Sequence, residues 1–310
     1  MSLQHEPVMM KEVLEVLSPK PGDVVVDGTV GLGGHAARMC DMIAPEGTLL
    51  AFDRDPEMLA EAELRLASKQ TVKRIYFNQD FRTAAHELAA RSLYANGILL
   101  DLGYNSAQVD DPTRAFSFKH DVPLDMRFNP ALGEPATAKV NRMSQVQLET
   151  AIFELADEKW AGPISRQIVE RRKTQPLRTT YDLVECVLAA IPPRAREKRI
   201  HPATRTFMAI RILTNDELEG LDDALFALAG RLADGGTLVV LSFHSGEDRI
   251  VKQAFRQLAD NGFIDLTRKP LVPGSSEISR NSRSRSTKLR AIRKPVSAGN
   301  GIPACLGSAS

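Results

Sequence analysis

Cysteine is scarce in this chain of 310 residues. Only Cys40, Cys186 and Cys305 occur, far apart and without a C-x-x-C or a Cys/His spacing. An odd number of scattered thiols is typical of a reducing compartment. The sequence therefore predicts neither a disulfide framework nor a zinc site, and we expect no metal.

Long apolar runs and targeting segments are absent as well. No run approaches the roughly 20 residues that a bilayer-spanning helix needs. The first residues, MSLQHEP, have neither the basic nor the apolar region of a secretory signal. Hydrophobic residues make up 43% of the chain and charged residues 25%, which is ordinary for a globular protein with a large core. We expect a cytoplasmic protein that does not contact a membrane.

A net excess of charge is also lacking, but the charges are segregated. The formal net charge is +1. Residues 166–211 carry eleven Lys and Arg against four Asp and Glu, and residues 268–294 carry nine against one. Two basic segments on an otherwise acidic protein predict a polyanionic partner, and together they favour nucleic acid over two solvated surfaces.

What the chain does have is a glycine-rich stretch after a short apolar strand. Val24 to Val26 are β-branched and predict a buried strand, Asp27 ends it, and four glycines follow before residue 35. Residues 35–43 then predict a helix. A doubly wound α/β fold forms nucleotide sites in this way, because glycine allows a close backbone approach and the helix N-terminus offers unpaired N–H groups.

Two carboxylates distinguish between the possible nucleotides. Residues 31–36 fit the relaxed G-x-G-x-x-G/A dinucleotide pattern, a weak signal that also occurs in turns without a ligand. Asp27 at the strand end would repel a pyrophosphate, whereas Asp53, at the end of the next strand, suits a ribose diol. A cationic nucleoside without phosphate, such as S-adenosylmethionine, fits this pair better than NAD.

Alternating strands and helices predict a parallel sheet with its ligand at the carboxyl ends of the strands. Strands are expected at 24–26, 48–52, 72–77, 97–101, 237–243 and 288–292, and helices at 5–19, 35–43, 55–68, 83–93 and 218–232. Asp27, Asp53, Phe81 and Asp101 fall at such ends. From about 107 to 202 helical periodicity replaces the strand pattern and predicts an inserted helical domain. The last residues, rich in Gly, Ser, Ala and Pro, are expected to be disordered.

Eight motifs resemble a single family over nearly the whole chain, from about residue 5 to residue 293. In order they are Asp27-Gly-Thr-Val-Gly-Leu-Gly-Gly-His35, Asp53-Arg-Asp-Pro56, Leu100-Asp-Leu-Gly103, Phe116-Ser-Phe118, Pro123-Leu-Asp-Met-Arg127, His201-Pro-Ala-Thr-Arg-Thr-Phe207, Ser242-Phe-His-Ser245 and Glu247-Asp-Arg249. They are similar to the bacterial small-subunit ribosomal RNA cytosine-N4 methyltransferases, the RsmH or MraW family.

This resemblance implies both a fold and an activity. The fold would be α/β, a class I (Rossmann-like) S-adenosylmethionine-dependent methyltransferase sheet over residues 1–108 and 205–310. An inserted all-α domain at 109–204 would recognise RNA. The reaction would methylate the exocyclic N4 amine of one cytidine in the decoding region of 16S ribosomal RNA in the small ribosomal subunit, leaving S-adenosyl-L-homocysteine.

The resemblance also implies where the cofactor binds. Its contacts fall on Gly33, Gly34, His35, Asp53, Phe81, Asp101 and Gln108. The two glycines would let the chain pass close to the methionine part, and His35 could donate to the cofactor carboxylate. Asp53 would accept both ribose hydroxyls, and Phe81 would either pack on adenine or belong to the core.

Catalysis should depend mainly on placement, because the N4 lone pair of cytosine is delocalised into the ring. An acceptor at the N–H would localise that pair and take up charge during transfer. We hypothesise that Asp101 or the side-chain carbonyl of Asn105 is this acceptor, and that Tyr104 stacks on the base. The target base must be unstacked to react.

Other polar residues could line the pocket of the target base, or serve only as helix caps and interdomain contacts. These are His201, Thr204, Arg205, His244 and Ser245. Basic residues could position the RNA through its phosphates. These are Arg171, Arg172, Lys173, Arg194, Arg196, Lys198, Arg199, Arg205, Arg283, Arg285 and Arg290.

The chain departs from the family pattern at two places. Its motifs also leave alternatives to the activity that the resemblance implies. The family usually has Ser-Ser-Pro where Asn105-Ser-Ala107 occurs, and Gly-Glu at Ala156-Asp157. One alternative is methylation of DNA cytosine N4, although the Pro-Pro-Tyr loop of those enzymes is missing. Others are an NAD-dependent oxidoreductase and a non-catalytic RNA- or DNA-binding protein. The sequence is compatible with a monomer or a homodimer.

Overall fold

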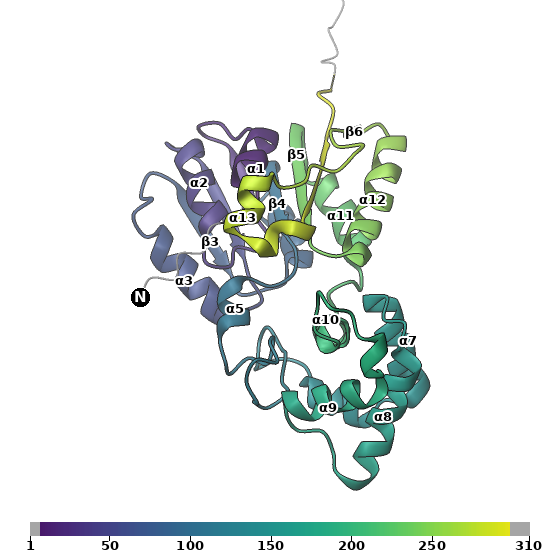
Figure 1. The fold of residues 1–310 in the computed structure, drawn as a ribbon. Coiled ribbons are helices and arrows are strands. Elements are labelled where there is room, and N and C mark those ends of the chain that lie inside the picture. The colour runs from purple at the N-terminus through teal and green to yellow at the C-terminus, as the bar shows by residue number, and fades with distance from the viewer. Residues whose placement is uncertain (1–6, 298–310) are drawn as a thin grey trace, which may run out of the picture.

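A computed structural model describes residues 7–297 of the chain. Within them the strands form one seven-stranded sheet in the order β3-β2-β1-β4-β5-β7-β6 (Figure 1). The strands are β1 (Val24–Asp27), β2 (Thr48–Phe52), β3 (Lys73–Phe77), β4 (Ala95–Asp101), β5 (Leu232–Ser242), β6 (Ile264–Asp265) and β7 (Lys288–Arg293). β1 to β5 pair in parallel, and β7 runs antiparallel between β5 and β6. The predicted class I, Rossmann-like sheet is confirmed.

Alternate residues of the central strands pack into different layers. Val25 and Leu99 belong to a core shared with α1 (Met10–Leu17), α2 (Gly34–Ile43) and α3 (Pro56–Leu66). Val26 and Leu100 belong to another core, shared with α4 (Ala84–Ala90), α11 (Leu221–Gly230) and α12 (Ser245–Asp260). Because both faces of the sheet are covered, these strands are apolar at nearly every position, which is why they were recognisable in the sequence.

The parallel register aligns the carboxyl ends of β1, β2 and β4. Asp27 pairs with Ala51 of β2 and with Leu99 of β4, so Asp53 and Asp101 each lie two residues beyond these partners. The glycine-rich loop after β1 is fixed to both neighbouring strands. Its Gly28 N–H donates to the carbonyl of Leu99 at 2.9 Å, and its Val30 N–H donates to that of Phe52 at 2.8 Å.

A second group of helices lies between β4 and β5 in the sequence. The short α5 (Ser106–Asp110) follows β4, and α6 (Ala136–Arg142), α7 (Gln145–Ala156), α8 (Ala161–Thr174), α9 (Thr180–Ala190) and α10 (Ala203–Asn215) come after it. Helices α6 to α10 share a core of their own and lie below the sheet in Figure 1. We call these five helices the helical unit. The boundary predicted between residues 204 and 205 lies inside α10.

The remaining elements are short. Three 3₁₀ turns are η1 (Phe81–Thr83), η2 (Pro193–Ala195) and η3 (Ser282–Ser286), and α13 (Ser275–Arg280) precedes the last of them. The two-residue β6 was not predicted, because it is too short to show a period. Most of the tail predicted to be disordered, and the start of the first predicted helix, lie outside the described residues. Across 7–297, no helix combines the length and the apolar character needed to cross a membrane.

Gly33 closes the glycine-rich turn at the start of α2. Its φ is +75°, a left-handed conformation that side-chain-bearing residues adopt at a cost. A Cβ on Gly33 would also lie 3.2 Å from the Cα of Ala62 on α3. Both conformation and packing therefore require glycine here, independently of any ligand.

We expect Gly33→Ala to lower the free energy of unfolding by about 2–3 kcal/mol, since the left-handed conformation alone costs about 1–2 kcal/mol in other residues and the contact with Ala62 adds to it. Thermal unfolding would measure this as a lower midpoint. Gly133→Ala shares the positive φ but has open space around it, so it isolates the conformational cost. Gly274→Ala, with ordinary φ and open space, should be neutral. Equal effects at Gly33 and Gly133 would show that the Ala62 contact contributes nothing.

Candidate active site

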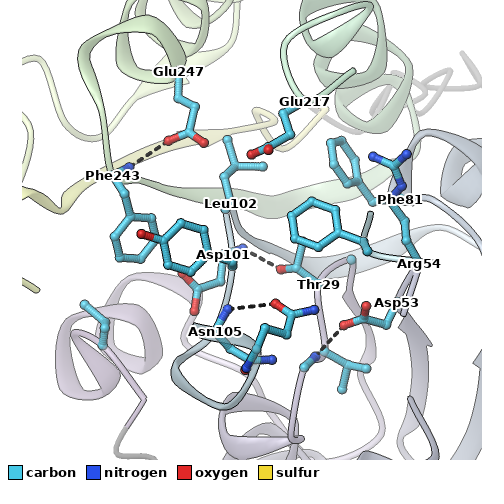
Figure 2. Close-up of a pocket in the computed structure, with 18 of the residues that line it drawn as sticks. Thr29, Asp53, Arg54, Phe81, Asp101, Leu102, Asn105, Glu217, Phe243 and Glu247 are labelled. Carbon is cyan, nitrogen blue, oxygen red and sulfur yellow. Dashed lines mark hydrogen bonds between the residues drawn. The ribbon is translucent and has the colours of Figure 1, made fainter. Parts of the chain in front are cut away.

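A cavity of about 350 Å³ opens at the carboxyl edge of the sheet. Figure 2 shows its centre, where Asp53, Asp101 and Phe81 come from successive strand ends and Glu217 and Glu247 lie across from them. Residues of the segment before α1, of α10 and of η3 complete the walls. This is where a parallel α/β sheet binds ligands.

Asp53 is held by the backbone of its own surroundings. Its Oδ2 accepts from the N–H of Gly31 at 2.8 Å and its Oδ1 accepts from the N–H of Asp55 at 2.9 Å. Each oxygen retains a further lone pair for a hydroxyl donor. Burial raises the pKa of Asp53 to about 6, against the opposing effect of these two hydrogen bonds.

Asp101 ends β4 and faces the cavity with one oxygen unused. Its backbone N–H donates to the hydroxyl of Thr29 at 2.6 Å, which ties β4 to the glycine-rich loop (Figure 2). Its Oδ2 lies 3.7 Å from Nδ1 of His35, whereas its Oδ1 is buried without a hydrogen-bond partner. Burial and then the charges of Asp27 and Glu247 raise the pKa of Asp101 well above its usual value.

His35 and Gly34 lie against the segment that precedes α1. The Nε2 of His35 is 3.0 Å from the carbonyl of Val8, and the ring is buried. A Cβ on Gly34 would come within 2.4 Å of Cγ of Pro7. Glycine at position 34 is thus required by this close packing, and both residues line the cavity.

Six of the seven predicted cofactor residues line the cavity. They are Gly34, His35, Asp53, Phe81, Asp101 and Gln108. The exception is Gly33, which turns the chain behind the cavity wall. Phe81 both lines the cavity and belongs to the core, and the guanidinium of Arg82 lies 5.0 Å from its ring centre.

Gln108 and Asn105 bond to each other. The side-chain carbonyl of Asn105 accepts from the N–H of Gln108, and that of Gln108 accepts from the N–H of Asn105, both at 3.0 Å. This reciprocal pair caps the N-terminus of α5. The amide of Gln108 donates to Asp55 at 2.8 Å. Both side chains therefore have structural partners at the cavity wall.

Tyr104 lines the cavity and has two neighbours at its ring. The guanidinium of Arg211 lies 4.2 Å from the ring centre, and the ring of Phe116 stacks at 6.2 Å. Arg211 in turn forms two 2.8 Å hydrogen bonds with Glu217. The ring remains 41% exposed, and the stacking of Tyr104 on a target base stays a prediction.

The residues predicted for the target-base pocket do not all reach the cavity. Only His244 lines it. Ser245 donates to Asp157 at 3.0 Å, which joins α12 to the end of α7. Arg205 pairs with Glu197 at 2.6 Å, and His201 packs on Phe118. Ser245 thus joins the two parts of the molecule, whereas Arg205 and His201 contact residues of the same segment between β4 and β5; a role at the target base stays a prediction for all three.

Sequence reasoning missed Arg211, Glu217 and Glu247. Glu247 is buried and accepts from the N–H of Phe243 at 2.7 Å. Burial alone would raise the pKa of Glu247, but His244 and the hydrogen bond from Phe243 outweigh burial and bring this pKa below its usual value. A single arginine within the apolar run Met-Ala-Ile-Arg-Ile-Leu was the available signal for Arg211, since buried cations need a partner.

Several basic residues predicted to grip RNA are neutralised within the protein. Arg171 pairs with Asp182 and Glu185, Lys173 with Glu170, Arg283 with Asp110, and Arg290 with Asp248. Arg172 and Arg196 donate to backbone carbonyls.

Across the described part of the chain, no group of three or more His, Cys, Asp or Glu residues is arranged to hold a metal ion.

Comparisons with known proteins identify the family of this chain. The model of the MraW methylase family matches residues 2–295. Ribosomal RNA small subunit methyltransferase H of Geobacter sp. (strain M21) is 43% identical over 307 residues, covering 94% of this chain and 98% of that one. The protein of the same name from Heliobacterium mobile is 40% identical over 313 residues, with coverage of 95% and 100%.

Among solved structures, a putative rRNA-methylase from Clostridium thermocellum is similar at 12% identity and a TM-score of 0.47, covering 94% of this chain and all of that one. The fold assignment itself comes from the strand order. The family match and the curated relatives span almost the full length on both sides. The chain belongs to the MraW methylase family, whose methyl donor is S-adenosylmethionine.

Proposed function

We propose that this protein methylates the exocyclic N4 amine of one cytidine in the decoding region of 16S ribosomal RNA, as a cytoplasmic enzyme acting on the small ribosomal subunit. The observation that carries the proposal is Asp101, whose side chain lines the cavity and whose buried Oδ1 has no hydrogen-bond partner among the described residues. A buried acceptor without a donor is costly, so a substrate N–H would satisfy it. The names of the curated relatives support small-subunit ribosomal RNA as the substrate.

The cavity suits S-adenosylmethionine. Asp53 would accept the ribose hydroxyls, because each of its oxygens has one backbone donor and a remaining lone pair. Gly34 and His35 would adjoin the methionine part, and Phe81 would present its uncovered surface to adenine. The buried acidic groups favour a cation over a pyrophosphate. When bound, the cofactor supplies an electrophilic methyl group.

Asp101 is our candidate for the catalytic acceptor. Its carboxylate would accept the N4–H hydrogen bond, which localises the lone pair on nitrogen, and would take the proton as the N–C bond forms. A raised pKa makes a carboxylate a stronger base, and burial, Asp27 and Glu247 all act in that direction. Asn105 is the weaker candidate, because its carbonyl already accepts from Gln108.

The helical unit is the part we assign to RNA recognition, in keeping with the division expected at residues 109–204. Arg194, Lys198 and Arg199, between α9 and α10, make neither an ion pair nor a hydrogen bond among the described residues and are exposed. Cations without internal partners are available for phosphate. Arg211 brings this unit into the cavity wall beside Tyr104.

The direct test is transfer of labelled methyl from S-adenosylmethionine to small ribosomal subunits that lack the modification, followed by nucleoside analysis. We expect N4-methylcytidine at one position. Duplex DNA and deproteinised 16S RNA serve as parallel substrates. Methyl transfer to duplex DNA but not to the subunit would contradict the proposed substrate. Label on a nucleoside other than N4-methylcytidine would contradict the proposed reaction.

Asp101→Asn should lower kcat on small subunits by roughly 10²–10⁴-fold, the usual contribution of a general base. We expect the affinity for S-adenosylhomocysteine, measured by calorimetry, to change less than the rate does. Asp41→Asn, on the exposed side of α2, is the matched control and should behave as wild type. Equal losses in rate and in cofactor affinity would show that Asp101 acts only as a cofactor ligand. An unchanged rate would show that Asp101 has no role in the reaction.

The affinity for S-adenosylhomocysteine should depend on pH through Asp53. Its pKa of about 6 means that the carboxyl is mostly ionised above pH 7 and mostly protonated at pH 5. Because ribose hydroxyls donate to the ionised form, we expect binding to weaken about tenfold between pH 7 and pH 5. Asp53→Asn should bind more weakly at pH 7 and lose this part of the pH dependence. The same pH slope in wild type and Asp53→Asn would assign the titration to another group.

A further inference from the structure

Three aromatic rings form a cluster at the start of α10, outside the cavity. The imidazole of His201 lies 4.7 Å from the ring of Phe118 at an interplanar angle of 35°, and Phe118 meets Phe207 edge to face at 4.9 Å. Phe207 belongs to the buried core of the helical unit, whereas His201 is exposed. The cluster therefore holds the exposed ring of His201 against Phe118, which in turn packs on the buried core of the helical unit.

The hydrogen bonding of His201 fixes its chemical form. Its Nδ1 accepts from the N–H of Ala203 at 3.2 Å, so Nε2 carries the proton of the neutral ring. Burial and then the charge of Arg196 lower the pKa of His201 below its usual value. The ring is thus neutral at physiological pH, with a face available for stacking and an N–H for an acceptor.

A loop of cations lies beside this ring in the sequence. We call residues 194–199 the basic loop; it contains Arg194, Arg196, Lys198 and Arg199. Arg196 holds it to the end of α9 by donating to the carbonyls of Leu188 and Ile191, at 2.7 and 3.0 Å. The acid of the loop, Glu197, is neutralised by Arg205. The other three cations remain exposed to solvent.

Helix α10 connects this surface with the active site. Met208 and Arg211 line the cavity from the same helix that His201 precedes. Seven residues separate His201 from Met208, roughly 10 Å at the rise of an α-helix. In Figure 1, α10 lies between the sheet and the rest of the helical unit. His201 therefore precedes the cavity-lining residues of α10 by about two helical turns; this places it outside the cavity but within reach of a nucleotide next to the reacting one.

We propose that His201, on its Phe118 base, and the basic loop form a binding site for a single-stranded nucleotide that flanks the methylated one. The base would stack on the imidazole, and Arg194, Lys198 and Arg199 would contact phosphates. A flat neutral ring beside cations is the combination that binds single-stranded nucleic acid. An acidic peptide would use the cations but not the ring. The inference rests on the proposed function, since it takes RNA as the substrate.

The test measures binding of a fluorescent single-stranded RNA of about a dozen nucleotides, a length comparable to the site of one single-strand-binding module. An abasic RNA with the same backbone is its control. We expect His201→Ala to weaken binding of the normal RNA about tenfold and to leave the abasic RNA unchanged. His201→Phe, which keeps a flat ring, should bind as wild type. Arg199→Gln should weaken both RNAs and reduce the slope of log K against log salt by about 0.7.

Three results would overturn the proposal. One is unchanged RNA binding in His201→Ala, and a second is an equal loss for normal and abasic RNA, which would mean a backbone contact. The third is binding of polyglutamate with the same dependence on His201, which would indicate a protein partner. These readouts do not involve methyl transfer. If the variants show the expected differences in RNA binding but the wild-type protein methylates no small subunit, the proposed function is contradicted and the proposed binding site is not.

Discussion

Three carboxyl groups meet where β1, β2 and β4 end, and the fold keeps all three largely out of water. Burial raises the pKa of Asp27 to about 7 and that of Asp53 to about 6, and it also raises the pKa of Asp101 well above its usual value. The parallel register places the three carboxyl groups together, because the ends of β1, β2 and β4 lie at the same edge of the sheet. The backbone N–H groups of Gly31, in the glycine-rich loop, and of Asp55 stabilise Asp53, while Asp101 keeps an unpaired oxygen. A cation and hydrogen-bond donors complete such a site, and a pyrophosphate does not.

The opposite wall of the cavity comes from the chain between β4 and β5, and two buried arginines attach it. Arg114 donates to Asp55 at the start of α3 and to the carbonyl of Phe128. Arg211 on α10 pairs with Glu217 and covers the ring of Tyr104. Removing one partner of a buried ion pair costs about 3–5 kcal/mol. Arg114 therefore attaches the chain after β4 to the start of α3, and Arg211 brings α10 against Tyr104 of the loop after β4, so the two parts of the molecule meet at the active site.

Features that repeat along the chain were predictable, and features that depend on pairing across the chain were not. The strands were recognised because burial on both faces makes them apolar, and Asp53 and Asp101 were recognised because they follow strand ends. By contrast, His201 and Arg205 carry the chemistry of a pocket, but neither is among the residues that line the cavity. Arg171 and Arg290 add to a basic segment in the sequence, yet each meets an acid from a distant position in the fold. Local composition cannot report such partners.

The departure of this chain from the family pattern at Asn105 has a local explanation. Asn and Ser are comparable N-cap residues, and Asn105 caps α5 through its bond to the N–H of Gln108. Its amide has a further contact with the sulfur of Met58 at 2.9 Å. The exchange therefore falls on a helix cap, and the strand end that carries Asp101 is unaffected. Of the two acceptors that the sequence suggested, Asn105 has its carbonyl bonded to the N-terminus of α5, whereas Asp101 has a buried oxygen without a hydrogen-bond partner among the described residues.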